Sequence, residues 1–200
     1  MIRLQKDLLY CSITNVYKDL KIRGNKYMRA HTVILGAGAT MATIPNGDKN
    51  GKKSSVMNGM IHELALDDLL KDVKIDTESN NIEDIYSGLY MKPEYQGVVV
   101  ELEKRIYKYF DSLELPDEPT IYDMLVLSLT NKDVIATFNW DPLLIQAYVR
   151  CCRITHNLPH ILCLHGNVAM GYCKEHEEFG TKEAICPVCK KRFKPIRLLY

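Results

Sequence analysis

HTVILGAGAT, residues 31–40, is the stretch that decides the fold. A short run of β-branched and apolar residues ends here in Gly36-Ala37-Gly38, a pattern typical of a buried parallel strand that leads into a glycine turn. Two glycines permit a tight turn and a close approach of the backbone, so the N-terminus of the next helix could hold a pyrophosphate. A Gly-x-Gly after a strand can also be only a tight turn, so the motif alone leaves both interpretations open.

Two more strands are predicted further along the chain, over Asp133–Phe138 and His160–Leu164. Between them a helix is expected to begin at Asp141-Pro142, because Asp is a good N-cap residue and Pro suits the first helical position. A strand, a helix and a strand in succession indicate a parallel sheet. The predicted fold class is therefore α/β with a parallel sheet.

The region between the first two strands is predicted to be helical. Apolar residues recur at near-helical spacing over residues 56–70, which indicates one helix, and again over Val98–Leu113. A polar segment, Asp76–Tyr95, separates these two helices. Thr120 is followed three residues later by Asp123, which resembles an acidic capping box at the start of a further helix.

The chain is expected to form one main domain over residues 31–200. Within it, residues 55–130 form a helical insertion, lobe or lid, and residues 170–192 form a small module. Residues 1–30 are an N-terminal extension, with apolar residues at helix-like spacing, to which the sequence assigns no function.

Positive and negative charges nearly cancel. Lys and Arg total 26 and Asp and Glu total 25, a formal net charge of +1 at pH 7. Such a balance gives no general attraction to nucleic acid or to an anionic membrane. No apolar run approaches the roughly 20 residues that a membrane-spanning helix needs. We therefore expect a cytoplasmic protein.

The seven cysteines are unevenly placed, and three of them lie near the end of the chain. Cys173 and His176 form one pair, and Cys186 and Cys189 follow after nine residues as a second pair. Two pairs, each separated by two residues, are the spacing expected for tetrahedral zinc. Four protein ligands leave no open position, so the metal would be structural. The alternative is that these residues merely share a hydrophilic loop.

Polar clusters follow all three predicted strands: Gly36–Thr40, Asn139–Asp141 and His165–Asn167. In an open α/β sheet, ligands bind at the edge formed by the carboxyl ends of the strands. His165 is the best general-base candidate among the six histidines, because its unperturbed pKa is about 6.5 and the other five are not at a predicted strand edge. The cluster after the second strand also has a structural interpretation, in which Asp141 caps a helix and Asn139 satisfies a turn. A lone histidine at such a place is more often structural than catalytic.

These motifs, in this order, resemble those of the sirtuin superfamily. Gly36-Ala37-Gly38-Ala39-Thr40 resembles the sirtuin phosphate loop Gly-Ala-Gly-x-Ser, Thr137-Phe138-Asn139-Trp140-Asp141 resembles Thr-Gln-Asn-x-Asp, and Leu164-His165-Gly166 resembles the catalytic His-Gly. The cysteine-paired module directly after His-Gly also matches, with His176 where a cysteine is usual. The resemblance implies a Rossmann-like sirtuin fold with a helical insertion and a small zinc module.

The most similar form of the family is a bacterial sirtuin-like one, in which Pro-Asn-Gly-Asp-x-Asn-Gly follows the glycine loop, here residues 45–51. The sirtuin Asp-Phe-Arg after the loop proline is absent, and Phe138 replaces the usual Gln. Both differences disfavour protein deacetylation. Bacterial sirtuin-like proteins of this kind are often NAD hydrolases in anti-phage defence. The resemblance therefore implies an NAD glycohydrolase that cleaves the nicotinamide–ribose bond.

The resemblance also implies roles for individual residues. Asn139 would orient the ribose and the attacking water, Asp141 would hold the nicotinamide carboxamide, and His165 would accept a proton from a ribose hydroxyl or the water. The glycine loop would hold the phosphates. The full set of NAD contacts implied is Gly36, Ala37, Gly38, Ala39, Thr40, Pro45, Asn46, Asp48, Asn139, Asp141 and Gly166.

Two other functions stay open. A sirtuin-type protein deacylase or ADP-ribosyltransferase would need an acceptor groove, and a non-catalytic NAD or ADP-ribose-binding module would regulate a partner. The expected partners are NAD and either a second copy of the chain or an effector or sensor protein, without nucleic acid or membrane. In the superfamily further strands follow the zinc module and complete the adenosine pocket, so we also expect the domain to be incomplete at Tyr200.

Overall fold

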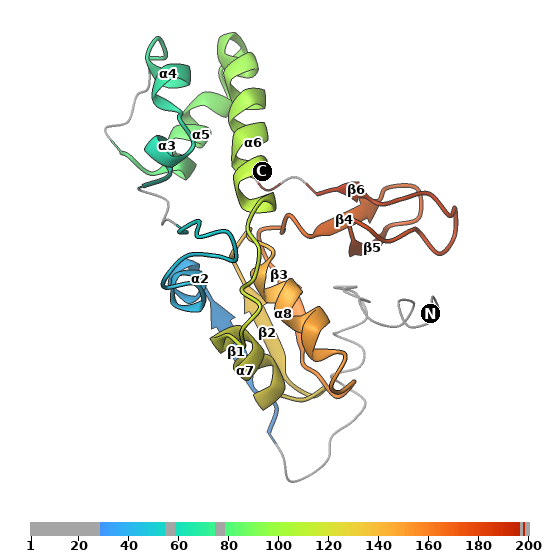
Figure 1. Ribbon diagram of the computed structural model, residues 1–200. Helices are drawn as coiled ribbons and strands as arrows, with labels where there is room; N and C mark the ends of the chain where they lie inside the picture. Colours follow the sequence, from blue (N-terminus) through green and yellow to red (C-terminus); the bar gives the residue numbers. More distant parts are fainter. Residues whose placement is uncertain (1–28, 55–58, 75–78, 197, 199–200) are drawn as a thin grey trace.

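The computed structural model describes residues 29–54, 59–74, 79–196 and 198, which form a mixed α/β structure. Figure 1 shows three parts: a parallel sheet with helices beside it, a lobe of helices above it, and a small antiparallel sheet to its right. Of the N-terminal extension expected over residues 1–30, residues 1–28 lie outside the described residues.

The parallel sheet has three strands, β1 (Thr32–Leu35), β2 (Val134–Thr137) and β3 (His160–Cys163). Their order is β1-β2-β3, and both pairings are parallel. The register aligns the last residues of the three strands with one another. The predicted parallel sheet is thus confirmed, and the residues that follow each strand are brought to one edge.

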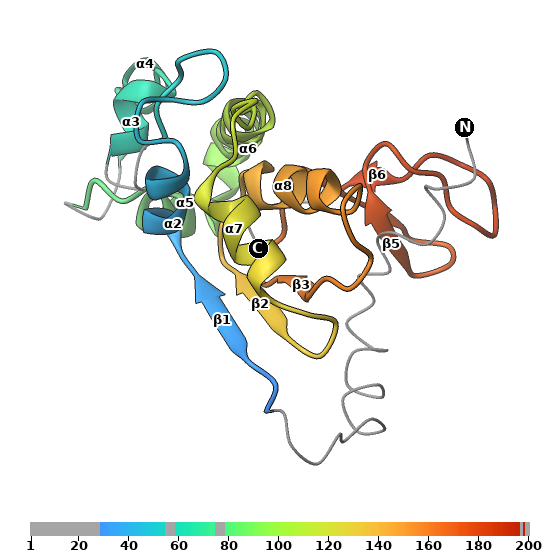
Figure 2. The same cartoon turned by 60° about the horizontal axis from the view of Figure 1, so that its bottom comes forward.

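Two helices lie over one face of this sheet, α7 (Ile121–Ser128) before β2 and α8 (Leu143–Cys151) after it. They pack against each other (Figure 2), as expected when right-handed connections join parallel strands in sequential order. β2, in the middle, is buried along its whole length. The opposite face is more open, since Ile34 of β1 is 68% exposed.

The helical lobe lies between β1 and α7 along the chain. Buried residues of its longest helix recur three or four positions apart from Val99 to Tyr109, so one apolar stripe faces the rest of the lobe. The elements of the lobe are α3 (Met60–Glu63), α4 (Asp67–Leu70), α5 (Ile82–Tyr90), the 3-10 helix η2 (Pro93–Tyr95) and α6 (Gln96–Asp111).

One prediction for this lobe is wrong. The single helix expected over residues 56–70 is two short helices within the described residues, because Ala65 between them has a left-handed backbone with φ of +49°. The Ala65 carbonyl accepts a hydrogen bond from Arg105 of α6 at 2.5 Å, which holds the break in place. The polar segment 76–95 contains α5, whose N-terminus is capped by the side chain of Asn81.

α7 begins at the capping box that the sequence predicts. The backbone N–H and the hydroxyl of Thr120 both donate to Asp123 at 2.7 Å. Arg150 of α8 donates to both oxygens of the same carboxylate, and to the Pro116 carbonyl at 2.7 Å. Against the effect of burial, the hydrogen bonds from Arg150 and Thr120 lower the pKa of Asp123. The start of α7 is therefore fixed to α8.

The small antiparallel sheet is folded around one aromatic ring. A Cβ on Gly171 would lie 2.6 Å from the Cβ of Phe193, and a Cβ on Gly180 would lie 2.5 Å from its ring. The two glycines lie opposite each other on neighbouring strands, so together they make the space that the buried Phe193 fills. The strands follow the order β5-β4-β6, with β4 (Met170–Cys173), β5 (Glu178–Thr181) and β6 (Lys194–Pro195).

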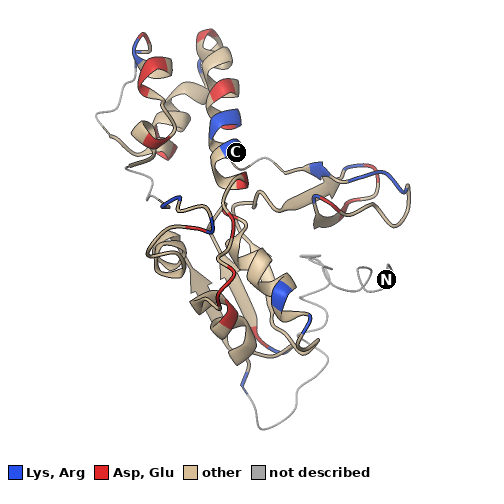
Figure 3. Cartoon of the chain, in the orientation of Figure 1, with Lys and Arg blue, Asp and Glu red and all other residues tan. Residues whose placement is uncertain are grey.

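Charged side chains of both signs are spread over the three parts (Figure 3). Several are paired at the surface, for example Lys49 with Asp117 and Arg192 with Glu183. Within the described residues, no helix combines the length and the apolar character that crossing a membrane would need.

Candidate functional site

The glycine turn after β1 leaves open space beside the backbone. Gly36 is extended and precedes α2 (Ala37–Thr43), a helix of seven residues. A Cβ placed on Gly36 or on Gly38 would meet no atom of another segment within 4 Å. Packing within the described chain therefore does not require glycine at these two positions. The close approach of a ligand to the backbone offers a reason for both.

Asn139, two residues after β2, lies against this turn. Its side-chain nitrogen is 2.9 Å from the Gly36 carbonyl oxygen, 2.9 Å from Thr40 Oγ1 and 3.3 Å from the Tyr122 hydroxyl. A carbonyl oxygen only accepts hydrogen bonds, so the nitrogen of the amide, and not its oxygen, must face Gly36. Asn139 Oδ1 has no hydrogen-bond partner among the described residues. It is therefore a free acceptor beside the glycine turn.

Both oxygens of the Asp141 carboxylate accept hydrogen bonds within the protein. Its Oδ2 accepts a hydrogen bond from the Thr40 hydroxyl at 2.6 Å, and its Oδ1 accepts one from the Leu143 backbone N–H at 3.0 Å. Asp141 thus caps α8, which begins one residue later than predicted. Burial raises the pKa of Asp141. The carboxylate joins α2 to α8, and its contact with a nicotinamide carboxamide stays a prediction.

Tyr122 of α7 completes this polar cluster, and the sequence analysis does not single it out. Its buried hydroxyl is 3.3 Å from Thr40 Oγ1 and 3.3 Å from the Asn139 nitrogen. Burial, reinforced by the Asp141 carboxylate, raises the pKa of Tyr122 to about 12. The one signal in the sequence is its place beside the capping residue Asp123, but the direction of the side chain depends on how α7 packs.

Asn167 belongs to the polar cluster predicted after the third strand, where the sequence analysis assigns it no role. Its side-chain nitrogen donates to the backbone carbonyls of Asn139 and Asp141, at 3.2 and 2.5 Å. Its side-chain oxygen accepts from the Ala169 N–H at 2.9 Å. This buried amide therefore ties the segment after β3 to the segment after β2 and fixes the backbone between the two candidate catalytic residues there.

His165 follows β3 but lies at the surface. Its ring contacts Phe138 edge to face, with ring centroids 4.9 Å apart, and both side chains are exposed. Within the described part of the chain, no hydrogen bond joins His165 to Asn139 or Asp141. Gly166 has a φ of +79°, a left-handed value that favours glycine. The turn after the histidine therefore has its own backbone reason for glycine.

The loop over residues 45–51 is built around Asp48. Its buried carboxylate accepts hydrogen bonds from the backbone N–H of Lys52 at 2.8 Å and of Glu114 at 3.0 Å. Gly47 has a φ of +103°, and a Cβ there would lie 2.7 Å from backbone atoms across the loop. Asp48 and Gly47 thus fix the shape of the loop, and a direct contact of Asp48 with NAD stays a prediction.

A cleft of about 570 Å³ opens between this loop and the segment of residues 116–121. Pro45 and Asn46, both predicted to contact NAD, are exposed and line it. The three predicted catalytic residues do not line it. The structure therefore places Pro45, Asn46 and Asp48 at this cleft, apart from the glycine turn and Asn139.

Cys173, His176, Cys186 and Cys189 form the predicted cluster, with all four ligand atoms within 4.8 Å of one another. Cys173 Sγ is 3.7 Å from Cys189 Sγ and 3.5 Å from His176 Nδ1, and Cys186 Sγ is 3.7 Å from the same nitrogen. A tetrahedral zinc ion with Zn–S bonds of about 2.3 Å holds its sulfur ligands about 3.8 Å apart. The distances fit, so the cluster could hold a structural metal such as zinc.

Each pair of ligands is held by a tight turn. The His176 N–H donates to the Cys173 carbonyl at 3.3 Å, and the Lys190 N–H donates to the Cys186 carbonyl at 3.0 Å. Although burial opposes it, the backbone N–H groups that follow in the turn, that of Cys189 first, lower the pKa of the Cys186 thiol. Burial raises the pKa of the Cys173 thiol in the same cluster, so the two thiols differ in their tendency to form the thiolate that binds a metal.

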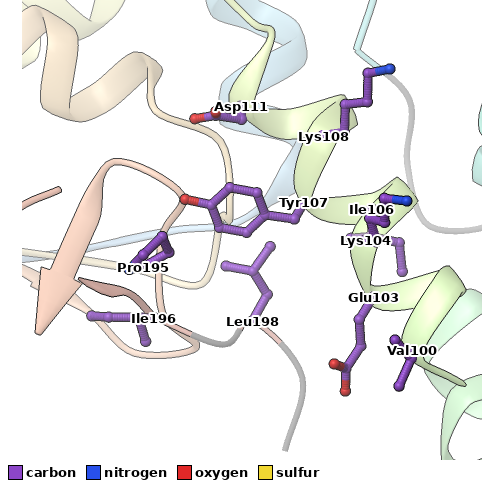
Figure 4. A pocket seen from close by; sticks show the side chains of 10 residues that line it. All are labelled: Val100, Glu103, Lys104, Ile106, Tyr107, Lys108, Asp111, Pro195, Ile196 and Leu198. Carbon is purple, nitrogen blue, oxygen red and sulfur yellow. The ribbon is translucent and has the colours of Figure 1, made fainter. Parts of the chain in front are cut away.

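A second cleft, of about 580 Å³, lies between α6 and the end of the small sheet (Figure 4). Tyr107 reaches from α6 toward this sheet, and its hydroxyl donates to the Val168 carbonyl at 3.0 Å. Burial raises the pKa of Tyr107 to about 12. None of the predicted site residues line this cleft, so it is separate from the polar edge of the parallel sheet.

The chain was compared with known protein families and with curated proteins. Neither a scan against models of protein families nor a search of curated proteins found a match for this chain. The functional interpretation therefore rests on the geometry of the sheet edge and on the resemblance of the motifs.

Proposed function

We propose that the chain is an NAD glycohydrolase of sirtuin-like type, which cleaves the bond between nicotinamide and ribose. One observation carries the proposal: the amide nitrogen of Asn139 is anchored to Gly36 and Thr40 beside an open glycine turn, while the amide oxygen is free. An anchored amide with a free oxygen suits a ribose hydroxyl or a water molecule, because both donate hydrogen bonds. The identity of the substrate comes from the resemblance of the motifs.

In the proposed reaction, water adds to the anomeric carbon of the ribose as the bond to the nicotinamide nitrogen breaks. The electron pair of that bond goes to the pyridinium ring, so nicotinamide leaves as a neutral molecule. Asn139 Oδ1 would hold the water or a ribose hydroxyl, and Asp141 would act by holding Thr40. His165, exposed at the same edge, would accept the proton that the water loses.

The metal cluster has a separate role in this proposal. Cys173, His176, Cys186 and Cys189 would bind one zinc ion that stabilises the small sheet, and four protein ligands leave no position for a reacting water. The resemblance extends the proposal to a cytoplasmic role in bacterial anti-phage defence. A second copy of the chain or an effector or sensor protein would then control when NAD is cleaved.

Gly38→Ala tests whether NAD occupies the open space beside the glycine turn. The added methyl group meets no other segment, and alanine is favoured over glycine in a helix by about 1 kcal/mol. The free energy of unfolding should therefore stay the same or rise. The methyl group would stand where NAD approaches, so kcat/KM for NAD cleavage should fall about tenfold or more, since 1.4 kcal/mol of lost contact is a factor of ten.

Gly97→Ala is the matched control, because Gly97 lies in α6 and a Cβ there also meets nothing within 4 Å. This variant should cleave NAD like wild type. Equal cleavage by Gly38→Ala and wild type would rule out the glycine turn as the NAD site. Binding of NAD by wild type without release of nicotinamide would refute the hydrolase and support a binding module, and turnover of an acyl-peptide would support a deacylase.

A further inference from the structure

We propose that Tyr122 is a positioning residue that holds the amide of Asn139 in its working orientation. The inference rests on the proposed function, in which Asn139 is the group that touches the substrate. It comes from the contacts around the two side chains, and the resemblance assigns no role to Tyr122.

Donors and acceptors can be assigned consistently to the hydrogen bonds around Thr40. The Thr40 hydroxyl has a single proton, and it donates that proton to Asp141 Oδ2 at 2.6 Å. Thr40 Oγ1 must therefore accept from its other two neighbours, the Tyr122 hydroxyl at 3.3 Å and the Asn139 nitrogen at 2.9 Å. The Asn139 amide has two protons for three acceptors, so the Tyr122 oxygen, at 3.3 Å, accepts a shared proton beside the shorter bonds to Gly36 and Thr40 at 2.9 Å. Tyr122 is thus both an acceptor for Asn139 and a donor to the residue that anchors it.

Tyr122 is itself held firmly. Its side chain is 1% exposed, and its helix begins at the capping box that Arg150 fixes to α8 through Asp123. A tyrosine hydroxyl is protonated at neutral pH and can donate to Thr40, and the raised pKa of Tyr122 extends this range to more alkaline pH. Because this rigid side chain contacts the amide nitrogen, the amide oxygen is the side-chain atom of Asn139 that is left for a ligand.

Tyr122→Phe removes the hydroxyl and keeps the ring. We expect kcat for nicotinamide release to fall about 10- to 100-fold with KM within about twofold of wild type, because displacement of an orienting group costs rate more than binding. If Tyr122 acts through Asn139, the double variant Tyr122→Phe/Asn139→Ala should be no slower than Asn139→Ala alone. Additive losses would overturn the proposal.

Tyr107→Phe is the matched control. Tyr107 also has a pKa raised to about 12 and also donates one hydrogen bond to the protein, but it lies on α6 beside the second cleft. Its kcat and KM should equal those of wild type. A similar loss of kcat in both variants would show a general effect of removing a hydrogen-bonded tyrosine hydroxyl and would overturn the specific role of Tyr122.

A readout without turnover separates this inference from the proposed function. The side-chain amide protons of Asn139, identified in a ¹⁵N-correlated spectrum by their absence in Asn139→Ala, should exchange with water about tenfold faster in Tyr122→Phe than in wild type. Unchanged exchange would overturn the positioning role, whatever the kinetics. Faster exchange together with no nicotinamide release by wild type would refute the hydrolase alone and leave the coupling of Tyr122 to Asn139 supported.

Discussion

Asp133 and Asp141 are both buried carboxylates, and their surroundings move their pKa values in opposite directions. Asp133 accepts hydrogen bonds from the backbone N–H groups of His31 and Thr130, both at 2.8 Å, and from the Thr130 hydroxyl at 3.0 Å. Although burial works against them, these bonds hold the pKa of Asp133 well below its ordinary value. Burial prevails at Asp141 and raises its pKa. One carboxylate thus stabilises the start of β1 as a charge, while burial disfavours the charged form of the other.

Asp133→Asn should lower the free energy of unfolding at pH 7 by about 2 kcal/mol, because the amide keeps the shape but loses the charge to which His31 and Thr130 donate. A group whose folded pKa lies below the unfolded value of about 3.9 stabilises the fold above that value, and this contribution is lost as the pH falls toward the folded pKa. In urea unfolding, the difference in the free energy of unfolding between wild type and Asp133→Asn should be the same at pH 7 and pH 5 and smaller at pH 3. An equal difference at all three pH values would contradict the lowered pKa of Asp133.

At the scale of elements, the strands of the parallel sheet are predictable and the lobe is only partly so. Short apolar runs bounded by turn residues identify β1, β2 and β3, since each strand is read from its own residues. The break at Ala65 is different, because apolar spacing continues across a residue whose left-handed backbone depends on the contact with Arg105. Although Trp140 lies between two site residues in the sequence, its ring packs on Phe110 of α6, with the two ring centroids 5.6 Å apart.

The small antiparallel sheet should depend on its metal. We predict one zinc per chain by metal analysis, and Cys186→Ser should release the metal and loosen residues 170–196. The sheet has three short strands around Phe193, so it buries too little apolar surface to stay folded without the metal.

Hydrogen exchange after chelation should therefore show loss of protection over β4 and β5, while β1 and β2 keep theirs. Asp133→Asn is a useful reference here, because it weakens the parallel sheet and leaves the metal ligands in place. Purified, unchelated protein with a zinc content near zero, or unchanged protection after chelation, would contradict the metal assignment.

At the scale of the whole molecule, contacts between the parts join the helical lobe to the small antiparallel sheet and to the segment before it. Asp111 of α6 pairs with Lys182 beside the small sheet, and Tyr107 of the same helix donates to the Val168 carbonyl between β3 and β4. α6 therefore joins the lobe to the segment that follows β3.

The part of the site that depends on the order of the strands along the chain can be predicted from the sequence. Parallel pairing brings Asn139 and the glycine turn together, as expected from the strands that precede them. The hydrogen bonds of Tyr122 and Asn167 are not predictable in this way, because they depend on how α7 and the turn after β3 pack. Local spacing also gives no indication that His165 would lie at the surface against Phe138.

Nicotinamide release from NAD by wild type, Asn139→Ala and His165→Ala is the most direct test of the central claim. Product is measured by chromatography, and circular dichroism of each variant serves as the folding control. The account predicts release by wild type and a loss of about 10²- to 10⁴-fold in each variant, the usual cost of removing a positioned acid–base or orienting group. No release by wild type, or full activity in both correctly folded variants, would contradict it.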